Sequence, residues 1–267
     1  MYTRIVLPLD GRPEELDTLK AADELSRRWD TSIELVALVT EADDVDARLA
    51  EVERRGARLS RSHGCHVSQR AWFVAPELID REAIDDETLV VMATSAPSRS
   101  ESFLGSVAGS MLRLLERPVL LIGPNCTIGA EWPSGPVLAC TDGSHHSESI
   151  VEPARDWSAS LDMPLWIVSV GYPVTPDAQE IHESAHVSHV AHDVAGDGQG
   201  EVNFDVLHGR RPADSIVDYA TRVGAGLIAM STHAHRGLRR LALGSVAMSV
   251  VHEARCPVLV VQPGVED

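Results

Sequence analysis

The stretch that decides the fold is GSVAMSVVHEARCPVLVVQP at residues 244–263, because a close copy of it occurs earlier in the chain. Residues 105–124 read GSVAGSMLRLLERPVLLIGP, and the two stretches align without a gap. They share the GSVA opening, a serine at 110 and 249, the Pro-Val-Leu that begins at 118 and 257, and a proline at 124 and 263. Such a repeat indicates a tandem duplication of one structural unit.

The beginnings of the two halves also match. The run RIVLPLDG ends at Gly11, and GPVLACTDG ends at Gly143, so each half opens with an apolar segment closed by Asp-Gly. A helix-like stretch follows each turn, with apolar residues on one face: Ala22, Leu25 and Trp29, then Ala154, Trp157 and Leu161. The Pro/Gly-rich segment PNCTIGAEWPSG at 124–135 separates the halves. We therefore expect domains at residues 1–125 and 135–267.

Within the second half, apolar runs alternate with helix-like segments. Strands are expected near 136–141, 165–170, 202–207, 226–230 and 257–261. Helices are expected near 147–161, 178–194, 212–223 and 245–254. This alternation predicts an α/β fold, with a parallel sheet in each half and helices on both faces. Such sheets bind ligands at the carboxyl ends of their strands, which places the Asp142 turn and the loop after Met230 at one crevice.

Composition narrows the function classes. A formal net charge of −17 over 267 residues disfavours non-specific nucleic-acid binding. No apolar run reaches the length of a membrane span, and the N-terminus lacks a signal-peptide pattern, so we expect a cytoplasmic protein without membrane contact. The four cysteines form no C-x-x-C pair and are expected to be reduced thiols.

The order and spacing of four segments resemble the universal stress protein family, in a tandem, two-repeat form. The segments are VLACTDGS, GRRPADSIVDYATRVGAGLIAMSTH, LGSVA and CPVLVV. The resemblance covers nearly all of both halves and implies two open five-stranded sheets of strand order 3-2-1-4-5. It also implies that edge strands of the two domains pair, here RPVLLIG with CPVLVVQ. Whether the whole chain also forms a homodimer is left open by the sequence.

The resemblance further implies an adenine-nucleotide site in the second half, with ATP as the expected ligand and ADP or AMP as alternatives. The family motif carries two glycines and a later Gly-Ser, which fall here on Ser231, Ala234, Gly244 and Ser245. The first two glycines are thus replaced. The expected site comprises Thr141, Asp142, Val170, Met230, Ser231, His233, Ala234, Arg236, Gly244, Ser245 and Val246.

The residue types of this expected site can bind the phosphate, ribose and adenine groups of a nucleotide. Backbone N–H groups at a helix N-terminus hold phosphate, and arginine pairs well with it, so Gly244 and Arg236 are assigned to phosphate. Asp142 would accept hydrogen bonds from the ribose hydroxyls or the adenine amine. The structural alternatives are that Asp142 only shapes a turn and that Ser245 only caps a helix.

The first half departs further from the motif. It keeps Asp10 and the Gly-Ser at 105–106, but Ala93 and Ala96 stand at the glycine positions. The intervening loop also contains Pro97, which lacks an amide donor, and Glu101, which repels phosphate. We expect this half to bind nucleotide poorly or not at all.

Four histidines lie at 182–192, where helical spacing places three on one face. An exposed polar face is favoured there over a metal site, and no metal ligand is assigned. The leading hypothesis is a stress-response regulator that binds nucleotide, is not an enzyme and acts on an unknown protein partner. The alternative is a nucleotide-free scaffold or dimerisation module. An enzyme of the wider adenine-nucleotide α-hydrolase-like class has no catalytic constellation to support it.

Overall fold

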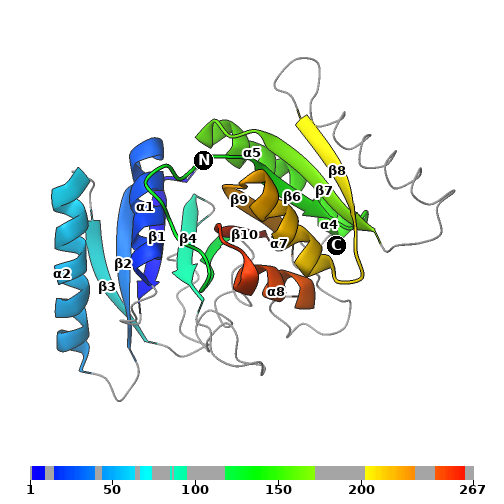
Figure 1. Cartoon of the computed structure of the whole chain (residues 1–267). Helices are drawn as coiled ribbons and strands as arrows, with labels where there is room; N and C mark the ends of the chain where they lie inside the picture. The colour runs from blue at the N-terminus through cyan, green and yellow to red at the C-terminus, as the bar shows by residue number, and fades with distance from the viewer. Residues whose placement is uncertain are drawn as a thin grey trace, which may run out of the picture.

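The computed structural model describes residues 2–9, 15–39, 44–63, 67–73, 85, 87–94, 118–171, 202–231 and 244–261. Strands and helices alternate through these residues (Figure 1). The first half contains β1 (Arg4–Leu9), α1 (Glu15–Trp29), β2 (Ser32–Val39), α2 (Val45–His63), β3 (Val67–Phe73), β4 (Thr88–Ala93) and β5 (Val119–Ile122). The second half contains β6 (Val137–Thr141), α4 (His145–Glu148), α5 (Val151–Leu161), β7 (Leu165–Gly171), β8 (Val202–His208), α7 (Pro212–Val223), β9 (Leu227–Ser231), α8 (Ser245–Glu253) and β10 (Val258–Val261).

All these strands belong to one ten-stranded sheet of order β3-β2-β1-β4-β5-β10-β9-β6-β7-β8. Read from either edge, each half has the order 3-2-1-4-5 and is parallel, which confirms the predicted fold class. The halves join where β5 runs antiparallel to β10, with Leu121 opposite Val258 and Val119 opposite Val260. The predicted edge pairing is therefore confirmed, and it merges the two expected sheets into one.

Each face of the sheet carries its own apolar core, because side chains alternate along every strand. One core receives Ile5, Leu35 and Ala139 from the strands, together with buried residues of α1 and α5. The other receives Val6, Val36 and Leu138, together with buried residues of α7 and α8. Both cores run through both halves, so burial holds the halves together as well as each half by itself.

The predicted strands of the second half agree with the structure to within one residue at each end. The expected helix 147–161 is instead two helices, α4 and α5, with Ser149 and Ile150 between them. Pro153 explains the break, because it has no N–H to donate to Ser149 and its ring clashes with a helical carbonyl four residues earlier. Proline is tolerated in the first turn of a helix, so α5 restarts at Val151. The expected helix 178–194 lies outside the described residues.

The segment that joins the halves packs tightly. Cys126 and Ile128 are buried in the core, and the backbone N–H of Ile128 donates to Oδ1 of Asp17 on α1 at 3.1 Å. Nε1 of Trp132 donates to the carbonyl oxygen of Gly226 in the second half at 2.8 Å. We call the β5–β10 pair and residues 123–136 the seam. The domain boundaries at 125 and 135 stay a prediction.

A second contact between the halves is aromatic. The rings of Trp29 on α1 and Trp157 on α5 meet edge to face, with centroids 5.1 Å apart. Tyr2 lies against both rings, and its hydroxyl oxygen accepts from Nε1 of Trp157 at 3.3 Å. The residues that the sequence placed on the apolar faces of these helices are thus buried, except Trp29, which is half-buried, and Trp29 and Trp157 touch each other across the halves.

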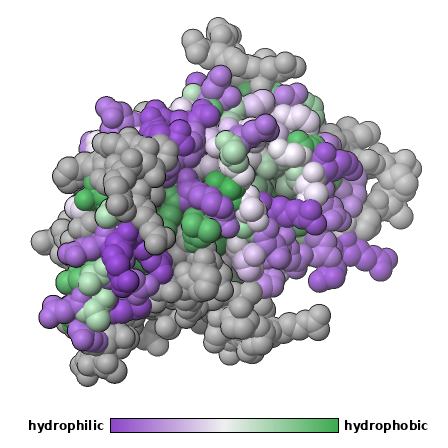
Figure 2. All heavy atoms as spheres, turned by 60° about the vertical axis from the view of Figure 1, so that its left-hand side comes forward, coloured by the Kyte–Doolittle hydropathy of each residue, from purple (hydrophilic) through white to green (hydrophobic). Residues whose placement is uncertain are grey.

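The described surface is largely hydrophilic on the face that Figure 2 shows. This agrees with the strongly acidic composition. Within the described ranges, every helix is too short or too polar to cross a bilayer.

Candidate functional site

The candidate site lies at the carboxyl edge of the second-half strands. In the register, Thr141 at the end of β6 is opposite Ser169 on β7, and Cys140 is opposite Met230 on β9. The next residues along these strands, Asp142, Val170 and Ser231, therefore lie at one edge of the sheet. The structure thus brings together predicted residues at the carboxyl ends of three separate strands, as a parallel sheet requires.

Asp142 opens a tightly hydrogen-bonded turn. Its Oδ1 accepts from the backbone N–H of Ser144 at 3.0 Å and from the Ser144 hydroxyl at 2.6 Å. Gly143 has φ of +75°, a conformation that favours glycine and explains the Asp-Gly pair. Asp142 itself is exposed. Asp142 therefore shapes a turn, as the structural alternative expected. Because it is also exposed, it lies at the surface of the candidate site.

Two serines of this turn were missed by the sequence analysis. Ser144 is the N-cap of α4, and its side chain accepts from the backbone N–H of Ser147. The Ser147 hydroxyl accepts from the backbone N–H of Asp142 at 3.0 Å and donates to the carbonyl oxygen of Ser144 at 2.8 Å. A serine directly after Asp-Gly and before a helix is the usual N-cap signal and could have identified Ser144.

The end of β9 carries Met230 and Ser231, which are both buried. Among the described residues, the non-glycines with positive φ are Asp30 and Asp162, so Ser231 is not one of them. Met230 belongs to the core beneath α8, together with Ala247. Since side chains alternate along a strand, Ser231 points to the opposite face, the one that Leu227 and Ala229 occupy.

Helix α8 begins with Gly244 as its N-cap, with φ −64° and ψ 155°, and no side chain caps it. No described residue lies within 4 Å of a Cβ added at Gly244. Ser245 is the first helical residue and is exposed, and Val246 is half-buried. The alternative in which Ser245 serves as the N-cap is therefore wrong, because that position belongs to Gly244.

Several predicted residues lie outside the described part of the chain. They are Asp10, the Gly-Ser at 105–106, His233, Ala234, Arg236 and the histidines at 182–192. Their assignments stay predictions.

Three buried thiols near the sheet ends are free: Cys126, Cys140 and Cys256. Burial raises the pKa of Cys140 to about 12 and that of Cys256 to about 12. Burial likewise raises the pKa of Cys126. Because the thiolate is the reactive form, these side chains are not suited to be nucleophiles near neutral pH. They confirm the expectation of reduced thiols for this part of the chain.

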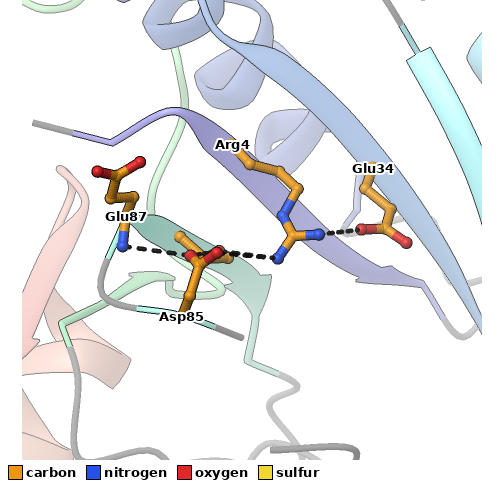
Figure 3. A network of polar contacts seen from close by, with 5 residues as sticks. Arg4, Glu34, Asp85 and Glu87 are labelled. Carbon is orange, nitrogen blue, oxygen red and sulfur yellow. Dashed lines mark hydrogen bonds and ion pairs between the residues drawn. The ribbon is translucent and has the colours of Figure 1, made fainter. Parts of the chain in front are cut away.

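A charge network lies at the opposite edge of the first-half strands (Figure 3). Nη1 of Arg4 on β1 is 3.3 Å from Oε2 of the buried Glu34 on β2, and its Nη2 donates to the Thr88 hydroxyl at 3.0 Å. Nη2 also lies 3.9 Å from Oδ2 of Asp85. This network pairs a buried carboxylate with a cation and ties three strands together, so its role is structural.

A groove of about 620 Å³ lies at the seam, lined by Asn125, Thr127, Glu253 and Arg255. It is at the C-terminal end of α8, whereas the candidate site is at the N-terminal end of that helix. No group of three or more metal-ligating side chains occurs in the residues that the structure describes.

Comparison with known proteins agrees with this geometry. Residues 134–262 match the model of the universal stress protein family. The second half of the chain is therefore similar to a universal stress protein domain. A universal stress protein of Mycobacterium tuberculosis is 29% identical over 191 residues, which cover 67% of this chain and 63% of that protein. One of Methanocaldococcus jannaschii is 45% identical over 62 residues, 23% of this chain and 36% of the relative. The matches thus span less than two thirds of either relative.

The solved structures extend the likeness of the fold to both halves. A universal stress protein from Archaeoglobus fulgidus aligns over 99% of this chain and 100% of its own, with a TM-score of 0.74 and 18% identity. Another universal stress protein from that organism was solved in complex with dAMP. It covers 48% of this chain and 96% of its own, with 25% identity and a TM-score of 0.39.

Proposed function

We propose that the second half of this chain binds an adenine nucleotide, ATP, at the carboxyl edge of β6, β7 and β9. The observation that carries the proposal is the start of α8. The backbone at position 244 does not require glycine, because φ is negative and no described residue would contact an added Cβ. No side chain caps the helix there. A bare helix start beside open space is suited to a phosphate, because the first N–H groups of a helix have no partner within it.

The turn at Asp142 supports the ribose or adenine end of the proposed site. Ser144 and Ser147 hold the turn through local hydrogen bonds, so Asp142 is fixed before any ligand arrives. A pre-ordered side chain loses little conformational freedom on binding. Val170, at the end of the adjacent strand, is half-buried and is assigned to the adenine through its backbone.

The replaced glycine at 231 does not argue against the proposal. Ser231 adopts no positive φ, so serine is accommodated there without the strain that glycine would relieve. Its side chain points to the face of the sheet opposite α8. The role that we propose is regulatory and not enzymatic: the bound nucleotide changes a surface that a protein partner of the stress response recognises.

A second candidate function is a scaffold that binds no nucleotide. It is favoured by one observation, that Oδ1 of Asp142 is already engaged by Ser144. In this function the turn would be purely structural and the helix start would face water.

Analysis of the purified protein for bound nucleotide distinguishes the two functions. The protein is denatured, and the supernatant is examined by anion-exchange chromatography at the absorbance of adenine. Calorimetric titration with ATP follows if no nucleotide is released. Binding of about one ATP per chain supports the proposal, and the absence of heat in that titration supports the scaffold.

The variant Gly244→Asn tests the assigned phosphate position. Asparagine is as good an N-cap as glycine or better, so the helix should keep its stability. Its side chain would fill the open space and take the amides itself, and we expect ATP affinity to fall by at least about tenfold. Gly129→Asn is the matched control, because a Cβ at Gly129 also meets nothing within 4 Å. Unchanged affinity in Gly244→Asn would place the phosphate elsewhere.

A further inference from the structure

We propose that Asn125 is a positioning residue for the nucleotide site, acting from the first half through helix α8. The inference rests on the proposed function and adds a residue that lies at the other end of this helix from the site. Nδ2 of Asn125 donates to the carbonyl oxygen of His252, in the last turn of α8, at 2.9 Å.

The sheet topology brings these two groups together. Helix α8 runs from the carboxyl edge, at Gly244, back to the amino end of β10. Because β5 is antiparallel to β10, the residues that follow β5 emerge at this same end. They meet the last turn of α8 there and contact it closely: a Cβ added at Gly123 would lie 1.9 Å from the carbonyl oxygen of Val251.

This contact completes the C-terminal cap of the helix. The last carbonyls of a helix have no intrahelical donor and need partners from elsewhere. The backbone N–H of Ala254 donates to Val250, and the Asn125 side chain supplies the donor for His252. The first half therefore holds the end of a second-half helix by a specific hydrogen bond.

The repeat does not carry the residues of this contact in both copies. The alignment that pairs Gly105 with Gly244 pairs Asn125 with Gly264 and Gly123 with Gln262. Gly264, at the position of Asn125, has no side-chain amide. Gln262, at the position of Gly123, has a Cβ, which the close approach at Gly123 does not allow. These residues thus hold a helix of the half with the expected nucleotide site, and the sequence does not repeat them in the other copy.

A movement at one end of α8 will be transmitted to the other. The helix has nine residues and is about 14 Å long. Its buried face, Ala247, Val250 and Val251, packs on the sheet, so the helix shifts as a unit. Asn125 also lines the open groove at the seam, so its hydrogen bond can be removed without unpacking the core.

The test is the ATP affinity of Asn125→Ala and Asn125→Asp, measured by calorimetry on folded full-length protein. Loss of this solvent-exposed hydrogen bond should weaken ATP binding about two- to threefold in Asn125→Ala, the lower end of what a hydrogen bond contributes. Asn125→Asp should weaken it more, because a carboxylate repels the carbonyl end of the helix. Arg28→Met is the matched control: Nη1 of Arg28 donates to the carbonyl oxygen of Leu161 at 3.3 Å, so it also joins the first half to the end of a second-half helix.

Hydrogen exchange of the α8 amides without nucleotide separates this inference from the proposed function. In Asn125→Ala, the amides of residues 248–250, which begin the hydrogen-bonded part of the helix, should exchange faster than in the wild type and in Arg28→Met. If the wild type binds no ATP, the proposed function fails, while faster exchange still supports coupling along the helix. Unchanged exchange, or equal loss of ATP affinity in Arg28→Met, would overturn the inference.

Discussion

The candidate site and the seam are built in opposite ways. At the site, the polar groups of the 142–148 turn bond to one another, and no described residue lies within 4 Å of a Cβ added at Gly244. At the seam, polar groups of the joining segment bond to both halves, Ile128 to Asp17 of the first and Trp132 to Gly226 of the second, and a Cβ added at Gly123 would meet backbone. The difference separates two kinds of mutational effect: changes at the site should alter affinity, and changes at the seam should alter stability.

The largest expected effect is an alkaline loss of stability caused by a buried thiol in each of the two regions. Cys140 lies near the end of β6, beside the candidate site, and Cys256 lies just before β10 of the seam. Burial raises the pKa of each thiol from the usual 9.0 to about 12. Below pH 9 the thiol is protonated in both folded and unfolded chains, so its contribution is constant. Between pH 9 and 12 only the unfolded chain ionises, and each thiol lowers stability by up to about 1.4 kcal/mol per pH unit.

Urea unfolding between pH 8 and 12 measures this effect. Cys140→Ala and Cys256→Ala should each flatten the alkaline fall in unfolding free energy to a similar extent, whatever their effect at pH 8. A slope that is unchanged in one variant would show that its thiol is hydrated in the folded state, and would break the symmetry between the two regions.

A smaller effect is expected from Gly123→Ala at the seam. The new Cβ would lie 1.9 Å from the carbonyl oxygen of Val251, so backbone must move. Such overpacking costs about 1–3 kcal/mol, which chemical denaturation will detect. Gly129→Ala is the control in the same segment, because its Cβ would meet nothing within 4 Å. Equal stability of the two variants would contradict the close packing of the seam.

The smallest effect is expected from Ser231→Gly at the site. Since Ser231 is not in a positive-φ conformation, glycine relieves no strain, and ATP affinity should change less than about twofold. Calorimetric titration beside the wild type measures it. A large gain in affinity would show that serine in place of glycine at position 231 weakens the site.

The strands could be predicted from the sequence because each is a short run of apolar residues buried on both faces. Such runs are continuous in the chain, so β6, β7 and β9 were located to within one residue. The helix-face residues Ala154, Trp157 and Leu161 were identified for the same reason, since their spacing alone places them together. The sequence analysis did not predict the helix break before Val151, although Pro153 indicates it.

The candidate site was predicted in part. The strand positions were predicted, and parallel topology brings the carboxyl ends of such strands to one edge. The residues Thr141, Asp142, Met230 and Ser231 at these ends were therefore expected to meet there. The details of the site were not predictable in the same way. That Gly244 and not Ser245 is the N-cap depends on the backbone angles at the helix start, which residue type alone does not determine.

By itself, the sequence determined the α/β class and the positions of the second-half strands, and it carries the internal repeat; the edge at which a ligand would lie stays a prediction. These follow from local periodicity and from the repeat, which require no knowledge of distant contacts. Only the tertiary structure decided that Asn125 meets His252, that Trp29 meets Trp157 and that Gly123 lies against Val251. Those pairs are more than a hundred residues apart in the chain. They come together only after the sheet has formed, because the antiparallel β5–β10 pair decides which ends of the two halves are neighbours.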